Sequence, residues 1–152
     1  MIDTAILAAK QTQHRAWHFL LIVVPVIAWM AFPASYWFDV ERVYVHDAVE
    51  GTTPLMEVDR VIRHPFRAEW TATVLRQVGE GFTTYCTAHG GNDYDPDAEL
   101  PDSIDLNWWT WPVECKLPSG SYMLKTLWIL HLPLMPDKQV RIRSNVFAIT
   151  EP

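Results

Sequence analysis

Residues 92–102, NDYDPDAELPD, carry the densest group of potential metal-binding side chains in the chain. The carboxylates at alternate positions are Asp93, Asp95, Asp97 and Glu99. Ca²⁺ takes roughly six to eight oxygen ligands, so carboxylates clustered on a loop suit this ion. The EF-hand pattern is not met, because Ala98 stands where that motif requires glycine. The segment is either a calcium site or a solvated acidic loop.

Three tryptophans follow this acidic segment: Trp108, Trp109 and Trp111. In a strand, alternate residues face opposite sides, so Trp109 and Trp111 would share a face that Trp108 does not. Tryptophan combines a large apolar area with one hydrogen-bond donor. Such a patch suits a sugar, a partner protein or a membrane surface. The alternative is that these rings pack against a disulfide and the domain core.

The chain contains two cysteines, Cys86 and Cys115. Neither belongs to a CxxC motif, which argues against a metal site. A disulfide between them would close a loop of about 30 residues and stabilise the fold by about 3 kcal/mol. We expect this disulfide in an oxidising compartment, whereas two buried free thiols are the alternative in a reducing one.

Known catalytic and nucleotide-binding motifs are absent from the sequence. There is no GxSxG, HExxH, P-loop or dinucleotide-binding pattern. The histidines are dispersed, so they define no catalytic group. The net charge of −6 repels nucleic acid. We therefore predict neither an enzyme nor a nucleic-acid-binding protein.

A strongly apolar stretch covers residues 16–32, AWHFLLIVVPVIAWMAF. Extended to residue 37, it reaches the roughly 20 residues that a helix needs to cross a bilayer core about 30 Å thick. We predict a single transmembrane helix over residues 16–37, bent at Pro25. A cleaved signal peptide and a buried core helix are the alternatives.

The charges flanking this stretch predict its orientation. Lys10 and Arg15 precede it, while only Arg42 follows it before Arg60. Basic residues favour the cytoplasmic side of a membrane helix. We predict an inner or plasma membrane protein. Its segment 1–15 is cytoplasmic, its residues 16–37 contact the lipid bilayer, and its domain 38–152 is periplasmic or extracellular.

Alternating polarity predicts strands after the apolar stretch. Residues 66–74, FRAEWTATV, alternate strictly and predict a strand with one buried face. Residues 122–130 are largely apolar on both faces, which favours a central strand. In the run 139–149 the apolar parity switches near Ser144 and Asn145. This switch predicts a bulge or a strand that passes from one sheet to another.

Further short apolar runs alternate with glycine- and proline-containing breakers, and no helical periodicity stands out after residue 38. About seven short strands with such spacing are typical of a β-sandwich. The predicted fold is therefore mainly β: one N-terminal transmembrane helix followed by an immunoglobulin-like antiparallel β-sandwich of about seven strands.

The C-terminal third contains LPSGSY at 117–122, KTLWI at 125–129 and RSNVF at 143–147. This pattern resembles small phage- or prophage-encoded single-pass membrane proteins with a disulfide-bridged, immunoglobulin-like β domain. The resemblance implies a viral or mobile-element origin and an accessory role in the cell envelope.

Two functions fit these patterns. In the first, a membrane-anchored structural or interaction protein uses aromatic and edge-strand surfaces to dock a protein partner or another copy of itself in an envelope or phage-related assembly. In the second, the domain is a calcium-dependent module that binds a carbohydrate or another ligand through the acidic segment and the tryptophans.

Overall fold

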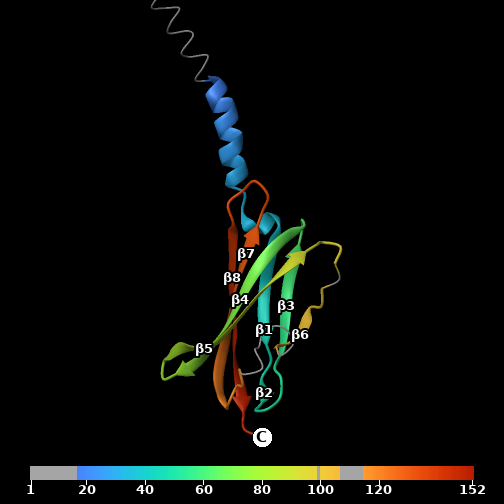
Figure 1. Ribbon diagram of the computed structural model, residues 1–152. Coiled ribbons are helices and arrows are strands. Elements are labelled where there is room, and N and C mark those ends of the chain that lie inside the picture. Colours follow the sequence, from blue (N-terminus) through green and yellow to red (C-terminus); the bar gives the residue numbers. More distant parts are fainter. Residues whose placement is uncertain (1–16, 99, 107–114) are drawn as a thin grey trace, which may run out of the picture. The chain divides into compact units, whose positions relative to one another are not determined.

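A computed structural model of the protein describes residues 17–98, 100–106 and 115–152 (Figure 1). The chain divides into two compact units, Met1–Pro33 and Ala34–Pro152. Residues 17–30 of the first unit form an α-helix. The second unit begins with a 3-10 helix, η1 (Ala34–Tyr36), and its further elements include eight strands among the described residues.

The prediction of a transmembrane helix over residues 16–37 is wrong for the described part of that range. The described helix ends at Met30. Among residues 17–98, 100–106 and 115–152, no helix is both long and apolar enough to cross a membrane. The predicted range extends too far toward the C-terminus, because Trp37 belongs to the core of the second unit, where its side chain is 7% exposed.

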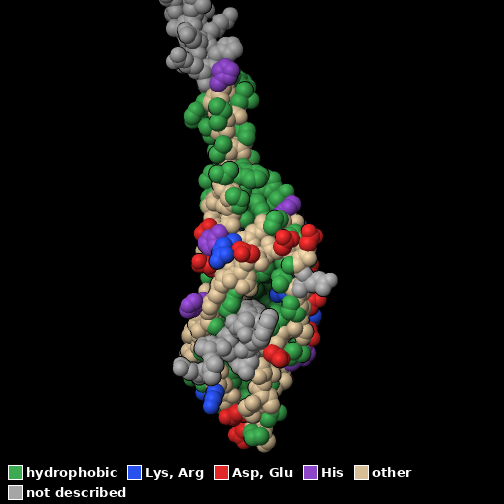
Figure 2. Space-filling view, turned by 45° about the vertical axis from the view of Figure 1, so that its right-hand side comes forward, with side chains coloured by type: hydrophobic (Ala, Val, Ile, Leu, Met, Phe, Trp, Pro, Cys, Tyr) green, Lys and Arg blue, Asp and Glu red, His purple; other side chains and the backbone are tan. Residues whose placement is uncertain are grey.

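Large apolar side chains cover the surface of the helix at residues 17–30 (Figure 2). Phe19, Leu21 and Ile22 are each about two-thirds exposed, at 66%, 66% and 67%. Trp29 and Phe32 make a tilted aromatic contact, with ring centroids 5.9 Å apart. This unit therefore buries little of its own apolar surface among the residues described.

The second unit contains two sheets that face each other (Figure 1). The three-stranded sheet has the order β1 (Phe38–Val45), β3 (Leu55–Ile62), β6 (Ser103–Asp105). The five-stranded sheet has the order β2 (Ala48–Val49), β8 (Lys138–Thr150), β7 (Gly120–His131), β4 (Phe66–Val78), β5 (Gly81–Tyr94). The predicted sandwich-like architecture is confirmed at this level.

Two strand predictions from the sequence are confirmed, and one generalisation needs correction. Strand β4 buries alternate residues from Phe66 to Val74, and β7 is central, between β8 and β4. The predicted sandwich was purely antiparallel with about seven strands. The described residues form eight, and β2 pairs with β8 in parallel.

The predicted irregularity near Ser144 and Asn145 is a β-bulge. The β7–β8 register shifts between Met123 and Lys125, which face Val146 and Arg143. At the bulge, the backbone N–H of Leu124 donates to the Ser144 hydroxyl at 2.9 Å. The extra residue disrupts the regular ladder locally and redirects polar side chains, which can then make other contacts.

The bulge links the two sheets through one amide side chain. Asn145 Oδ1 accepts from the backbone N–H of Val45 at 2.8 Å, and Asn145 Nδ2 donates to the Val45 carbonyl at 2.8 Å. The side chain therefore pairs with β1 as another strand would. The backbone N–H and carbonyl of Val45 on β1 are thereby hydrogen-bonded. Left unpaired at a buried edge, these two groups would cost free energy.

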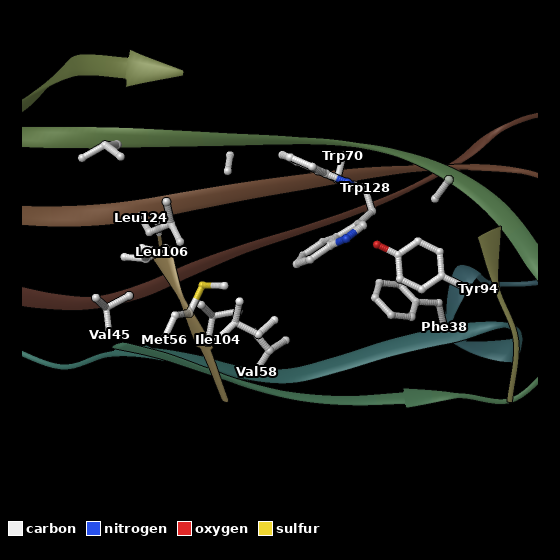
Figure 3. Close-up of a cluster of buried hydrophobic side chains, with 14 of the residues drawn as sticks. Phe38, Val45, Met56, Val58, Trp70, Tyr94, Ile104, Leu106, Leu124 and Trp128 are labelled. Atoms are coloured by element: carbon white, nitrogen blue, oxygen red, sulfur yellow. The ribbon is translucent and has the colours of Figure 1, made fainter. Parts of the chain in front are cut away.

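The core between the sheets contains two distinct groups of side chains (Figure 3). We define the aliphatic cluster as Val45, Met56, Leu106 and Leu124, each at most 2% exposed. We define the aromatic cluster as Phe38, Phe66, Tyr94 and Trp128. In the aromatic cluster, the rings of Phe66 and Tyr94 are nearly parallel, 5.0 Å apart at 8°.

Candidate functional site

The predicted disulfide is present in the structure. Cys86 on β5 is bonded to Cys115, and their Cα atoms are 6.2 Å apart. Next to it, the Tyr85 hydroxyl donates to the backbone carbonyl of Lys116 at 2.8 Å. Both contacts hold the middle of β5 to the segment that leads into β7.

The predicted calcium ligands are only partly brought together. Asp93 lies on β5, where it forms an exposed ion pair with Arg67 at 3.1 Å. Asp95 instead accepts a hydrogen bond from the backbone N–H of Asp97 at 2.9 Å. Glu99 lies outside the described residues. Within the described ranges, no group of three or more His, Cys, Asp or Glu side chains is placed to hold a metal ion. The calcium site stays a prediction.

The predicted aromatic surface lies outside the described residues, because Trp108, Trp109 and Trp111 fall within the gap at 107–114. Its role in binding a partner, a sugar or a membrane therefore stays a prediction. Three other tryptophans are buried in the second unit: Trp37, Trp70 and Trp128 are 7%, 5% and 3% exposed.

A cavity of about 230 Å³ opens between the two sheets beside the aromatic cluster, and we call it the interlayer pocket. Its strand-borne polar and aromatic lining consists of Arg60, Asn92, Tyr94 and Trp128. Leu100, Pro101 and Ile104 complete the wall. A largely apolar cavity with a few convergent polar groups is the usual form of a small-molecule site.

Arg60 is the one side chain of this lining that carries a full charge. Residues 56, 58, 60 and 62 share the core-facing side of β3, and Met56 and Val58 are buried there. Arg60 therefore occupies a core-facing position and is half-buried. Its Nη2 donates to the Pro101 carbonyl at 2.8 Å.

The guanidinium of Arg60 is partly desolvated and has no close anionic partner in the described part of the chain. Burial lowers the pKa of Arg60, against the opposing attraction of Tyr94 and Asp102. No ion pair within 4.0 Å joins Arg60 to a described carboxylate. An arginine held in this way retains donors that can bind a ligand.

Tyr94 and Trp128 form the opposite wall of the interlayer pocket. The Tyr94 hydroxyl points toward the Trp128 side chain (Figure 3). Burial raises the pKa of Tyr94, and hydrogen bonding by Trp128, the charge of Arg60 and hydrogen bonding by Asn92 oppose that rise. Phe38 packs edge-on against Trp128, with centroids 5.4 Å apart. The wall is thus rigid and aromatic.

The segment after β5 closes the interlayer pocket from one side. The backbone N–H of Val58 donates to the Asp102 carbonyl at 2.8 Å, two residues along β3 from Arg60. Together with the Arg60–Pro101 hydrogen bond, this contact ties residues 101–102 to β3. Residues 101–102, which cover one side of the pocket, are therefore held by β3, the strand that also carries Arg60.

The interlayer pocket is not among the sites predicted from the sequence, although one signal of it is present there. In the series Met56, Val58, Arg60, Ile62, a single charged residue interrupts an otherwise apolar strand face. A charge at such a position marks either a strand that leaves the core or a functional cavity. The polar partners from β5 and β7 are far away in sequence, so their proximity could not be deduced.

The second candidate surface is the outer edge of β5. This strand is last in the five-stranded sheet, and no strand of the described residues pairs with its outer side. A bulge at Tyr85 interrupts its pairing with β4, because Val74 faces Cys86 while Leu75 faces Thr84. From Cys86 to Tyr94 the pairing is regular. The opposite edge strand, β2, has only 2 residues.

No protein-family model matches the chain, and none of the curated proteins compared with it is similar. The resemblance to phage- and prophage-encoded membrane proteins therefore stays a prediction.

Proposed function

We propose that the chain is a binding protein whose sandwich docks a protein partner by adding a strand of that partner to the outer edge of β5. The observation that carries the proposal is the length of this edge: β5 has 14 residues, and the segment from Cys86 to Tyr94 pairs regularly with β4. An edge of this length offers a row of backbone donors and acceptors to an extended polypeptide.

The composition of β5 supports docking at this edge. Proteins protect exposed edge strands with lysine, proline, other charges or strong shortening. From Gly81 to Asn92, the strand contains no Lys, Arg, Asp, Glu or Pro. Gly90 and Gly91 add no side chain that could obstruct an approaching backbone. The edge is therefore open to pairing except at the bulge near Tyr85.

The disulfide supports the same proposal. An edge strand has a neighbour on only one side, so it frays more easily than a central strand. The Cys86–Cys115 bond and the Tyr85–Lys116 hydrogen bond hold β5 at the start of its regular segment. A strand that is fixed before binding loses less conformational entropy when a partner pairs with it.

The disulfide also bears on where the domain works. Disulfides persist in oxidising compartments and are rare in the cytosol. We place the β domain in the periplasm or outside the cell on this ground, and we assign it no catalytic step. The partner is a protein, or a second copy of this chain.

Site-specific photo-crosslinking in the native host tests this function. One variant carries a photo-reactive amino acid at His89 on β5, and the control carries it at Arg141 on β8. Both positions are exposed and lie in one cross-strand row of the same sheet, through Thr71 and Leu127. We expect a discrete cross-linked product from His89 and none from Arg141.

Proline substitutions then separate edge pairing from contact with the face of the sheet. Backbone N–H groups alternate in direction along a strand, so either Thr87→Pro or Ala88→Pro removes a donor from the outer edge. That variant should keep its melting temperature and lose the cross-link. Cross-links that survive both substitutions, or that form equally from Arg141, would refute the proposal. Mass spectrometry of the product distinguishes another protein from a second copy.

A further inference from the structure

We infer that the interlayer pocket binds a monocarboxylate whose aromatic or branched apolar group lies against Trp128 and Ile104, with its carboxylate on Arg60. This site is separate from the outer edge of β5, and the inference does not depend on strand pairing there. Four features of the pocket lead to it: its charge, its walls, its volume and the charge of the surrounding protein.

The charge of the pocket selects an anion. Arg60 presents a planar fork of N–H donors, and a guanidinium binds a carboxylate through two parallel hydrogen bonds. Only one of these donors has a described partner, the Pro101 carbonyl. Leaving a half-buried guanidinium without an anion costs desolvation free energy, which a bound carboxylate would offset.

The walls of the pocket select the rest of the ligand. Trp128 and Tyr94 provide aromatic surface, and Leu100 and Ile104 provide aliphatic surface. The Tyr94 hydroxyl points toward the Trp128 side chain (Figure 3). The far wall therefore presents mainly ring carbon atoms to a ligand, and Asn92 is the additional polar group at the lining.

The volume of the pocket limits the size of the ligand. About 230 Å³ corresponds to roughly eight water molecules at about 30 Å³ each. That space accepts a small acid with a single ring or a branched chain.

The charge of the surroundings favours a single negative charge on the ligand. The protein has a net charge of −6, and Asp102 attracts the Arg60 guanidinium from nearby. A phosphate dianion would meet this negative field with one arginine to balance it, whereas a monocarboxylate matches the single guanidinium.

The test uses the full chain and benzoate as the probe, with benzamide as a neutral molecule of the same shape. Binding is followed through the NMR signals of the Trp128 indole N–H and the Arg60 side-chain N–H groups. Benzoate should shift both signals in a saturable way. The affinity for benzamide should be lower than that for benzoate by about tenfold or more. Equal binding of benzoate and benzamide, or no saturable shift with any acid tested, would overturn the inference.

Two arginine variants test the role assigned to Arg60. Arg60→Met should weaken benzoate binding by about tenfold or more, because it removes the charge and all the guanidinium N–H donors. Arg143→Gln, which removes an exposed arginine on β8, is the matched control and should leave the affinity within about twofold. If Arg60→Met does not fold, Arg60→Lys keeps a charge without the planar fork, and its affinity should fall as well. Unchanged affinity in the folded Arg60 variants would contradict the site.

A peptide arm identifies the source of the carboxylate. The peptide Gly-Gly-Gly-Phe with a free C-terminus is compared with its C-terminal amide. If only the free acid binds, and more tightly than benzoate, the ligand is the end of a polypeptide. If benzoate binds and the peptide does not, the ligand is a free small acid. Both results support the carboxylate site.

Discussion

The aliphatic cluster and the aromatic cluster both fill the space between the two sheets, but the protein around each of them closes that space differently (Figure 3). Beside the aliphatic cluster, Asn145 joins the sheets through two hydrogen bonds to Val45. Beside the aromatic cluster, the space widens into the interlayer pocket, and a core-facing position carries Arg60. One side is sealed and the other contains a cavity with a charge.

This difference indicates a division between stability and binding. A sealed aliphatic core gains free energy from every methylene it removes from water. A cavity loses contacts on its lining, and a half-buried guanidinium adds a desolvation cost. Such a feature adds nothing to the stability of the fold. Substitutions beside the aliphatic cluster should therefore lower the free energy of unfolding much more than removal of the Arg60 charge does.

The largest expected effect is at the aliphatic cluster. Leu124 is 1% exposed, so Leu124→Ala leaves a cavity in a closed part of the core. We expect the free energy of unfolding to fall by about 3 kcal/mol. Denaturant unfolding of the full chain measures this loss. A loss below about 1 kcal/mol would show that this side is not tightly packed.

The hydrogen bonds that seal this side give the next largest effect. Asn145→Ala leaves the N–H and the carbonyl of Val45 without their side-chain partners. We expect a loss of about 2 kcal/mol in the free energy of unfolding. Asn145→Asp keeps an acceptor for the Val45 N–H but places a charge against its carbonyl, so it should not restore stability. Equal stability of Asn145→Asp and the natural protein would contradict this account.

A glycine pair tests the packing at Trp70, which lies beside Trp128 in Figure 3. A Cβ atom at Gly90 would lie 2.4 Å from Trp70 Cζ2, whereas one at Gly91 would meet its nearest atom at an ordinary 3.5 Å. Gly90→Ala should therefore cost about 1 to 3 kcal/mol, because the indole must shift. Gly91→Ala is the matched control on the same strand and should cost clearly less in the same unfolding measurement.

Alkaline pH should reveal the buried phenol of the aromatic cluster. Burial raises the pKa of Tyr94 in the folded protein, so the unfolded chain loses this proton first. The contribution of Tyr94 is therefore fully present below about pH 10 and is lost as the pH rises through the folded pKa. Tyr94→Phe should show a shallower fall in melting temperature above pH 10. The fall should not vanish, because burial also raises the pKa of Tyr122.

The strands of the sandwich could be predicted from the sequence because they follow local periodicity. Phe66, Ala68 and Trp70 alternate with polar neighbours, and the structure buries those three residues. The parity switch near Ser144 and Asn145 likewise marks the bulge. In both cases the side chains of one short segment contain the whole signal.

The burial of Trp37 and the interlayer pocket depend on contacts between segments that are far apart in the sequence. Trp37 was assigned to a membrane helix because hydropathy alone does not distinguish a lipid environment from a protein core. Its burial depends on packing in the second unit. The interlayer pocket was missed for the same reason, since Arg60 acquires its meaning only beside Tyr94 and Trp128. The disulfide was found because the chain has only two cysteines to pair.

The most direct test of the division between the two sides is the unfolding free energy of Arg60→Met. This variant replaces a partly desolvated guanidinium with an apolar side chain and loses one hydrogen bond, to the Pro101 carbonyl. We expect a change of less than about 1 kcal/mol. Val58→Ala, on the same face of β3, should lose about 2 kcal/mol as the control. A loss of about 3 kcal/mol or more in Arg60→Met would show that Arg60 holds the fold together, and would contradict its assignment to ligand binding.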